Sequence, residues 1–272
     1  MTDRYEFARA LARKAGAVAL DYWRRRDELV VELKGPGDFV SLADREVETL
    51  IRSEIAVAFP GDAFLGEETA AQFTAQLANK VDRCWVVDPI DGTHNFLRGI
   101  PYWNVAIAYV EDGRATIGAV FDPPHDELFH ATRGGGAWSD AGGRTSRLHA
   151  AATAALPGAY VALGHHDRSV SPAYLELRRK LMDAGAAMRN FGSAALQLSH
   201  VAAGRLDGFI ELELSIWDAI GALVIVEEAG GYAAPFLPAR PTAKAPCLAC
   251  APGIAQLLGD LTGIRQVPAG PD

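Results

Sequence analysis

The sequence has few cysteines and lacks long apolar runs. Its 272 residues include only three cysteines, Cys84, Cys247 and Cys250, and a small odd number argues against the disulfide framework of a secreted domain. No run of about 18 uncharged apolar residues occurs. The first 26 residues carry charges throughout and lack the apolar region of a signal peptide. We therefore expect a cytoplasmic protein without a membrane span.

Basic charge is also scarce. The chain has 26 Lys and Arg against 34 Asp and Glu, a formal net charge of −8. An acidic chain without a basic block repels phosphate backbones, so nucleic acid is not expected as the main partner. With 49% hydrophobic and 22% charged residues, the chain can instead bury a sizeable core in one large or two small globular units.

The cysteine pair in "CLAC", Cys247 and Cys250, has two interpretations. A CxxC can be half of a zinc site or a redox pair. The pair lies in an apolar run between Pro246 and Pro252, and no second CxxC follows. The run therefore favours a short buried strand, in which residues three apart face opposite sides.

The first half of the chain combines helices and strands. Apolar residues recur at helical spacing in residues 1–26 and 44–59. Extended segments separated by turn residues predict a largely antiparallel sheet. These segments are 29–33, 84–88, 103–110, 115–121 and 127–132.

From about residue 145 the pattern changes to alternating strands and helices. Ser171 and Pro172 have the residue types of a helix start, and Gly204 that of a helix end. The organisation is α+β. We expect an N-terminal subdomain, residues 1–145, with a largely antiparallel sheet, and a C-terminal subdomain, residues 146–272, with a smaller mixed sheet.

Two aspartates three residues apart stand out in "WVVDPIDGTHNF". Asp88 ends an apolar strand, Pro89 prevents a helix there, and Asp91 with Gly92 has turn character before a helix that begins near Thr93. Two carboxylates and a main-chain carbonyl can then converge beside free N–H groups. That arrangement suits magnesium together with a phosphate.

Other acidic residues strengthen this interpretation. Glu67 and Glu68 are adjacent in "GEET", and Asp218 begins an almost wholly apolar helix. An isolated Asp218 could simply complement the helix dipole. Together, the acidic positions favour metal-assisted phosphoryl chemistry, with solvated turns and helix caps as the alternative.

Three segments, "GEET", "DPIDGTHNF" and "WDAIGALVIVEEAGG", resemble the signatures of the inositol monophosphatase family. They occur in the family's order and spacing, and the resemblance extends over nearly the whole chain. It implies a layered αβαβα fold and a magnesium-dependent, lithium-sensitive phosphomonoester hydrolase. It also implies a homodimer.

The resemblance implies a role for each acidic residue. Glu67 and the carbonyl of Ile90 would bind a first magnesium ion, Asp88 would bridge two ions, and Asp91 and Asp218 would hold the second. Two or three ions per site are expected. Two cations about 3.5 to 4 Å apart can neutralise a phosphate ester and activate water without a phosphoenzyme.

Catalytic residues also follow from the resemblance. Glu67 and Thr93 would orient and deprotonate the attacking water, and Asp44 would pair with the threonine. The backbone N–H groups of Gly92 and Thr93 would receive the phosphate. Lys34 corresponds only approximately to a lysine of the family.

The substrate-binding segments follow from the same resemblance. The segment with Arg189, Gly192, Ser193 and Ala194, together with Glu211, resembles the part of the family's site that binds substrate hydroxyls. A carboxylate suits a polyol or an ammonium group equally. We therefore expect a small phosphorylated polyol or amino alcohol, most simply inositol 1-phosphate.

Five alternatives to these assignments are open. The enzyme could be a histidinol-phosphate phosphatase or a 3′(2′),5′-bisphosphate nucleotidase. A regulatory protein-binding role is an alternative of another class. Arg189 and Glu211 could form an ordinary ion pair, and His165 and His166 could lie in a surface loop rather than at the edge of the site.

Overall fold

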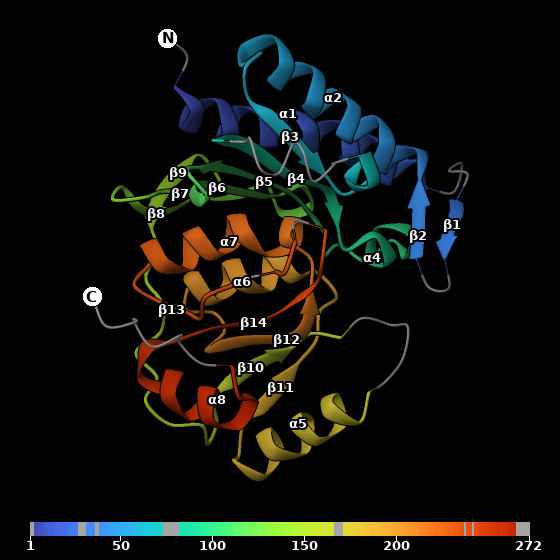
Figure 1. Cartoon of the computed structure of the whole chain (residues 1–272). Helices are drawn as coiled ribbons and strands as arrows, with labels where there is room; N and C mark the ends of the chain where they lie inside the picture. Colours follow the sequence, from blue (N-terminus) through green and yellow to red (C-terminus); the bar gives the residue numbers. More distant parts are fainter. Residues whose placement is uncertain are drawn as a thin grey trace.

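Helices and sheets alternate in layers in the computed structural model of the chain (Figure 1). The structure describes residues 3–26, 42–72, 82–165, 171–236, 238–240 and 242–264, and the backbone alone of 31–35 and 38–41. The α-helices are α1 (Arg4–Arg24), α2 (Leu42–Ala58), α4 (Thr93–Arg98), α5 (Pro172–Asp183), α6 (Ala194–Ala202), α7 (Ile216–Glu228) and α8 (Ala255–Thr262).

A seven-stranded sheet in the order β3-β4-β5-β6-β7-β8-β9 forms one layer. Its strands pair antiparallel except for β3 and β4, which run parallel. The predicted antiparallel sheet is therefore confirmed. The strands are β3 (Ala63–Gly66), β4 (Arg83–Asp91), β5 (Asn104–Glu111), β6 (Arg114–Asp122), β7 (Glu127–Thr132), β8 (Gly136–Ala141) and β9 (Arg144–Arg147).

The second sheet has five strands in the order β11-β10-β12-β14-β13 and is mixed, as predicted. Its strands are β10 (Tyr160–Leu163), β11 (Ala187–Arg189), β12 (Gly208–Leu214), β13 (Tyr232–Ala233) and β14 (Ala245–Cys250). Cys247 and Cys250 on β14 are buried, free and in different core clusters. The buried-strand interpretation of "CLAC" is confirmed. A separate hairpin joins β1 (Val31–Gly35) to β2 (Asp38–Ser41).

Apolar clusters fill the spaces between the layers. One joins α1 and α2 to the seven-stranded sheet, a second contains α6 and α7 between the two sheets, and a third joins the five-stranded sheet to α5 and α8. This arrangement confirms the layered α+β fold. Because α6 and α7 pack between the two sheets, the packing itself marks no boundary between two subdomains. The predicted division between residues 145 and 146 therefore stays a prediction. Within the described residues, no helix combines the length and apolar composition needed to span a membrane.

Helix α7 lies directly on the backbone of the seven-stranded sheet. A Cβ atom at Gly118 on β6 would be 2.0 Å from the carbonyl oxygen of Gly221 on α7. A Cβ atom at Gly221 would in turn be 3.2 Å from the carbonyl oxygen of Ile107 on β5. Two glycines therefore set the distance between this helix and the sheet.

Gly118→Ala should destabilise the protein by about 2 kcal/mol or more, because the added methyl group overlaps backbone atoms that cannot rotate away. The measurement is urea denaturation followed by circular dichroism. Gly61→Ala is the matched control, since its Cβ atom would be 3.8 Å from the nearest side-chain atom, on Arg83. Equal stability of the two variants would contradict this description of the α7 contact.

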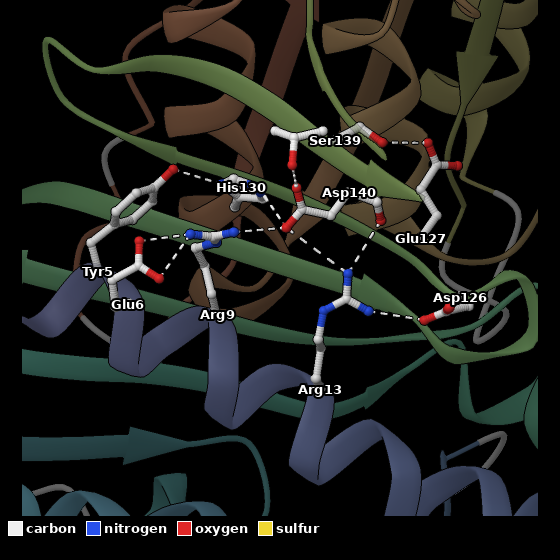
Figure 2. Close-up of polar contacts among 10 residues, drawn as sticks. Tyr5, Glu6, Arg9, Arg13, Asp126, Glu127, His130, Ser139 and Asp140 are labelled. Atoms are coloured by element: carbon white, nitrogen blue, oxygen red, sulfur yellow. Dashed lines mark hydrogen bonds and ion pairs between the residues drawn. The ribbon is translucent and has the colours of Figure 1, made fainter. Parts of the chain in front are cut away.

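Polar contacts fix the first half of α1 to β7 and β8 (Figure 2). The guanidinium of Arg9 donates to Asp140 Oδ2 at 2.8 Å, and the hydroxyl of Tyr5 lies 2.6 Å from Nδ1 of His130. Burial alone would raise the pKa of Asp140, but hydrogen bonds from Thr145 and Arg9 outweigh it and lower that pKa to about 2. The folded state therefore favours the ionised form of Asp140.

A carboxyl group whose pKa is lowered by folding stabilises the protein above its unfolded pKa, and this contribution is lost as the pH falls through the folded value. For Asp140 the loss spans pH 3.8 to about 2. Asp140→Asn should lower the unfolding free energy at pH 7 by about 1 to 3 kcal/mol. The substitution should also make the unfolding free energy depend less on pH in the acid range. Denaturant titrations at several pH values measure this dependence.

Asp126→Asn is the control for this experiment. Asp126 pairs with Arg13 at 2.9 Å, but its side chain is 73% exposed, and exposed pairs contribute about 0 to 1 kcal/mol. An acid dependence of Asp140→Asn that matches the wild type would contradict the assigned role of the carboxylate.

Candidate active site

A cavity of about 390 Å³ opens where the end of β4 meets α4, α6, α7 and β12. Carboxylates line one part of it, and backbone and amide groups line another. The lining residues are Glu67, Asp88, Ile90, Asp91, Gly92, Thr93, His94, Asn95, Gly164, His165, Asn190, Phe191, Gly192, Ser193, Ala194, Gln197, Glu211, Leu214 and Asp218.

Three carboxylates from different elements converge in this cavity. Glu67, Asp88 and Asp218 each offer an oxygen, and these oxygens lie within 4.8 Å of one another. The parallel pairing of Gly66 with Val87 brings Glu67, which follows β3, beside Asp88 on β4. Asp218 comes from the first turn of α7, whose N-cap is Ser215. The fold thus brings together carboxylates that are 151 positions apart at the extremes, from 67 to 218.

Electrostatic repulsion accumulates in this cluster. Burial raises the pKa of Asp88, and the negative charges of Glu67 and Asp218 raise it further. Burial and the charge of Asp91 raise the pKa of Asp218 to about 7. A divalent cation would remove the repulsion, and an all-oxygen donor set suits magnesium, a hard cation. The residues therefore fit the expected metal.

Asp91 lies outside this group of three. Its Oδ2 accepts hydrogen bonds from Ser193 Oγ at 2.7 Å, Asn104 Nδ2 at 2.8 Å and the Ala195 N–H at 2.8 Å. Its Oδ1 accepts from the Ala194 N–H at 3.3 Å. Asp91 therefore holds the N-terminus of α6 against β4, a contact that the sequence did not indicate.

The backbone between the two aspartates differs from the predicted turn. Strand β4 continues through Pro89 to Asp91 with a shift of register, and the turn is formed by Gly92, whose φ is 95°. The expectation that Asp91 itself belongs to the turn is wrong, because Asp91 pairs with Asn104 on β5. Helix α4 does begin at Thr93, as predicted.

Thr93 contacts two of the residues that the sequence singled out. Its hydroxyl lies 3.1 Å from the carbonyl oxygen of Ile90 and 3.4 Å from Oδ1 of Asp44. Asp44 belongs to α2 and is buried. The structure therefore brings the predicted Thr93 and Asp44 pair together at the edge of the cavity.

Asn95 joins two segments of the site. Its side-chain amide donates to the carbonyl oxygens of Tyr102, at 2.8 Å, and Phe191, at 2.7 Å. The loop before α6 is thereby tied to the turn at Gly92. The sequence analysis did not identify Asn95 as a site residue. Its position three residues after that turn is the sequence feature that could have indicated this role.

The expected substrate residues separate into two groups. Gly192, Ser193, Ala194 and Glu211 line the cavity. Arg189 is exposed and is not among the described lining residues. Its guanidinium lies 4.9 Å from the ring centre of Tyr160 and donates to the carbonyl oxygen of Met188 at 2.8 Å. The structure thus does not place Arg189 in the cavity or in a described ion pair with Glu211.

Glu211 reaches the cavity because Gly164 leaves room for it. A Cβ atom at Gly164 would be 2.0 Å from Oε2 of Glu211. Burial raises the pKa of Glu211 to about 8, and the charges of Asp218 and Asp91 contribute. His165 also lines the cavity and packs against Tyr174 in a tilted arrangement with ring centres 4.6 Å apart. His166 and the side chain of Lys34 lie outside the described residues.

Comparisons with known proteins agree with this fold. The inositol monophosphatase family matches residues 1–256. An inositol-1-monophosphatase of Rhizobium meliloti is 40% identical over 230 residues, which cover 84% of this chain and 80% of that protein. The Nus factor SuhB of Xylella fastidiosa is 37% identical over 227 residues, with 83% and 79% covered.

Among solved structures, an extragenic suppressor protein SuhB of Bartonella henselae superposes with a TM-score of 0.81. It is 34% identical, and the match covers 96% of this chain and 97% of the other. Fold, cavity and relatives together define a phosphomonoester hydrolase. The chain belongs to the inositol monophosphatase family.

Magnesium should raise the melting temperature of the wild type, because a cation relieves the repulsion among the three carboxylates. At about 100 times the dissociation constant, binding adds about 2.7 kcal/mol. Asp218→Asn should melt no lower than the metal-free wild type and should lose most of the magnesium shift, as measured by calorimetry. Asp183→Asn, on the exposed end of α5, should keep the full shift. An unchanged shift in Asp218→Asn would remove that residue from the metal centre.

Proposed function

We propose that the chain is a magnesium-dependent inositol-1-monophosphatase. The observation that carries this proposal is the single cavity that contains the Glu67, Asp88 and Asp218 cluster together with Glu211. A cation site beside a carboxylate that can accept hydroxyl bonds suits a phosphorylated polyol. The Rhizobium relative carries the same activity in its name.

Two or three magnesium ions would be held by five residues. Glu67 and the carbonyl of Ile90 would hold the first ion, Asp88 would be shared, and Asp91 and Asp218 would hold another. When bound, magnesium supplies positive charge to the phosphate oxygens and to the leaving alkoxide. Because Asp91 also caps α6, its side chain would couple the metal centre to the loop that binds substrate.

The chain's own groups would carry the proton and orient the substrate. Glu67 and the hydroxyl of Thr93 would position the attacking water, and Glu67 would accept its proton. Asp44 would keep the Thr93 hydroxyl in place across the 3.4 Å contact. The N–H groups of Gly92 and Thr93 would bind the phosphate, which aligns it with the water.

Glu211 and the loop of Gly192, Ser193 and Ala194 would bind the alcohol part of the substrate. A nucleotide is a second candidate, because Phe191 packs on Tyr102 with ring centres 5.1 Å apart and His165 packs on Tyr174 beside the same cavity. Aromatic rings of this kind can stack on a base. Phe209, by contrast, is fully buried and offers no such surface.

The cellular location, the oligomeric state and the lithium sensitivity are proposed from the resemblance and the composition. The active form would be a cytoplasmic homodimer that lithium inhibits. A regulatory protein-binding role, suggested by relatives named Nus factor, would use the surface of the protein rather than the carboxylate cluster. It would therefore persist in a variant that has lost hydrolysis.

The proposal is tested by phosphate release with magnesium. We expect kcat/KM to be highest for inositol 1-phosphate, compared with histidinol phosphate and adenosine 3′,5′-bisphosphate. Asp88→Asn serves as the blank, because Asp91→Asn would also disturb the cap of α6. Preference for either other substrate would change the substrate assignment, and a blank-level rate on all three would contradict the enzyme proposal.

Glu211→Gln tests the substrate end of the cavity separately. It should lower kcat/KM for inositol 1-phosphate about tenfold, the effect of losing about 1.4 kcal/mol. Hydrolysis of p-nitrophenyl phosphate, which has no hydroxyl groups to bind, should change little. An equal loss on both substrates would place Glu211 in the chemistry rather than in recognition of the alcohol.

A further inference from the structure

A buried carboxylate on α2 holds the loop that carries Glu67. Glu48 is only 2% exposed. Its Oε2 accepts the backbone N–H of Glu68 at 2.8 Å, and its Oε1 accepts the hydroxyl of Thr69 at 2.7 Å. Hydrogen bonds to a charged group are stronger than those between neutral groups. The loop is therefore anchored directly after Glu67.

Close packing fixes the same loop before Glu67. A Cβ atom at Gly66 would lie 2.3 Å from Oε2 of Glu48. Gly66 is not among the glycines with positive φ, so glycine is required here for space rather than for backbone conformation. Glu67 thus sits between a tight contact at Gly66 and a hydrogen bond at Glu68, and both involve the carboxylate of Glu48.

Glu48 also shares a helix face with Asp44. The two residues are four positions apart on α2 and are both buried, so their side chains lie on the same side of the helix. Asp44 contacts Thr93, and Glu48 contacts the Glu67 loop. One face of α2 therefore touches the two segments that would position the attacking water.

We propose that Glu48 is a positioning residue that aligns Glu67 for cation binding, an inference that rests on the proposed function of Glu67 as a magnesium ligand. Without Glu48, the loop loses both anchors and Glu67 must be ordered by the metal itself. Partners that orient metal ligands typically contribute 10-fold to 100-fold to metal affinity. A residue that only stabilised the fold would leave that affinity unchanged.

The test is isothermal titration of magnesium into the purified full chain. Glu48→Ala should weaken magnesium binding at least 10-fold. Glu48→Gln should recover most of the affinity, because its carbonyl oxygen can accept the Glu68 N–H while its amide donates to the Thr69 hydroxyl. Thr69→Val removes one anchor only and should cause a smaller loss, which keeps the test valid if Glu48→Ala does not fold.

Glu54→Ala is the matched control on the same helix. The side chain of Glu54 is 40% exposed and pairs with Lys14 at 2.9 Å, so its removal should leave magnesium affinity unchanged. Wild-type affinity in Glu48→Ala and Thr69→Val, even with lower melting temperatures, would overturn the positioning role. Absence of magnesium binding by the wild type would instead contradict the proposed function.

Discussion

Repulsion among clustered carboxylates is the constraint on which the site depends. Glu67, Asp88 and Asp218 bring their oxygens within 4.8 Å of one another, and burial together with this proximity raises the pKa of Asp88. Without a cation, such a cluster destabilises the folded protein, because like charges repel one another strongly where little water surrounds them. A cation turns the same geometry into a binding site. The fold must therefore supply the stability that the cluster removes.

That stability comes from contacts that lie just outside the cluster. Gly118 lets α7 approach the seven-stranded sheet closely enough to deliver Asp218. Asp91 ties the end of β4 to the first turn of α6. Each contact joins a strand of the larger sheet to a helix of the middle layer. Because the three carboxylates are held by separate elements, their alignment depends on how closely the layers pack.

Local sequence patterns predicted much of the fold and the acidic part of the site. Alternation and helical periodicity indicated most of the elements, and resemblance added the layer order. Contacts between distant elements could not be predicted. The parallel register that places Glu67 beside Asp88, and the cap that Asp91 forms on α6, need residues far apart in the chain. The position of Arg189 could not be predicted for the same reason. Arg189 lies on the edge strand β11, where its guanidinium contacts Tyr160 instead of the cavity.

We propose that the carboxylate cluster binds a divalent cation in the cavity that would receive the substrate. The most direct measurement is an anomalous-scattering map from crystals soaked in manganese, which can replace magnesium at oxygen sites. We expect a strong peak coordinated by Glu67, Asp88 and Asp218. A map with no peak among these three residues, from crystals of protein that hydrolyses phosphomonoesters under the same conditions, would contradict it.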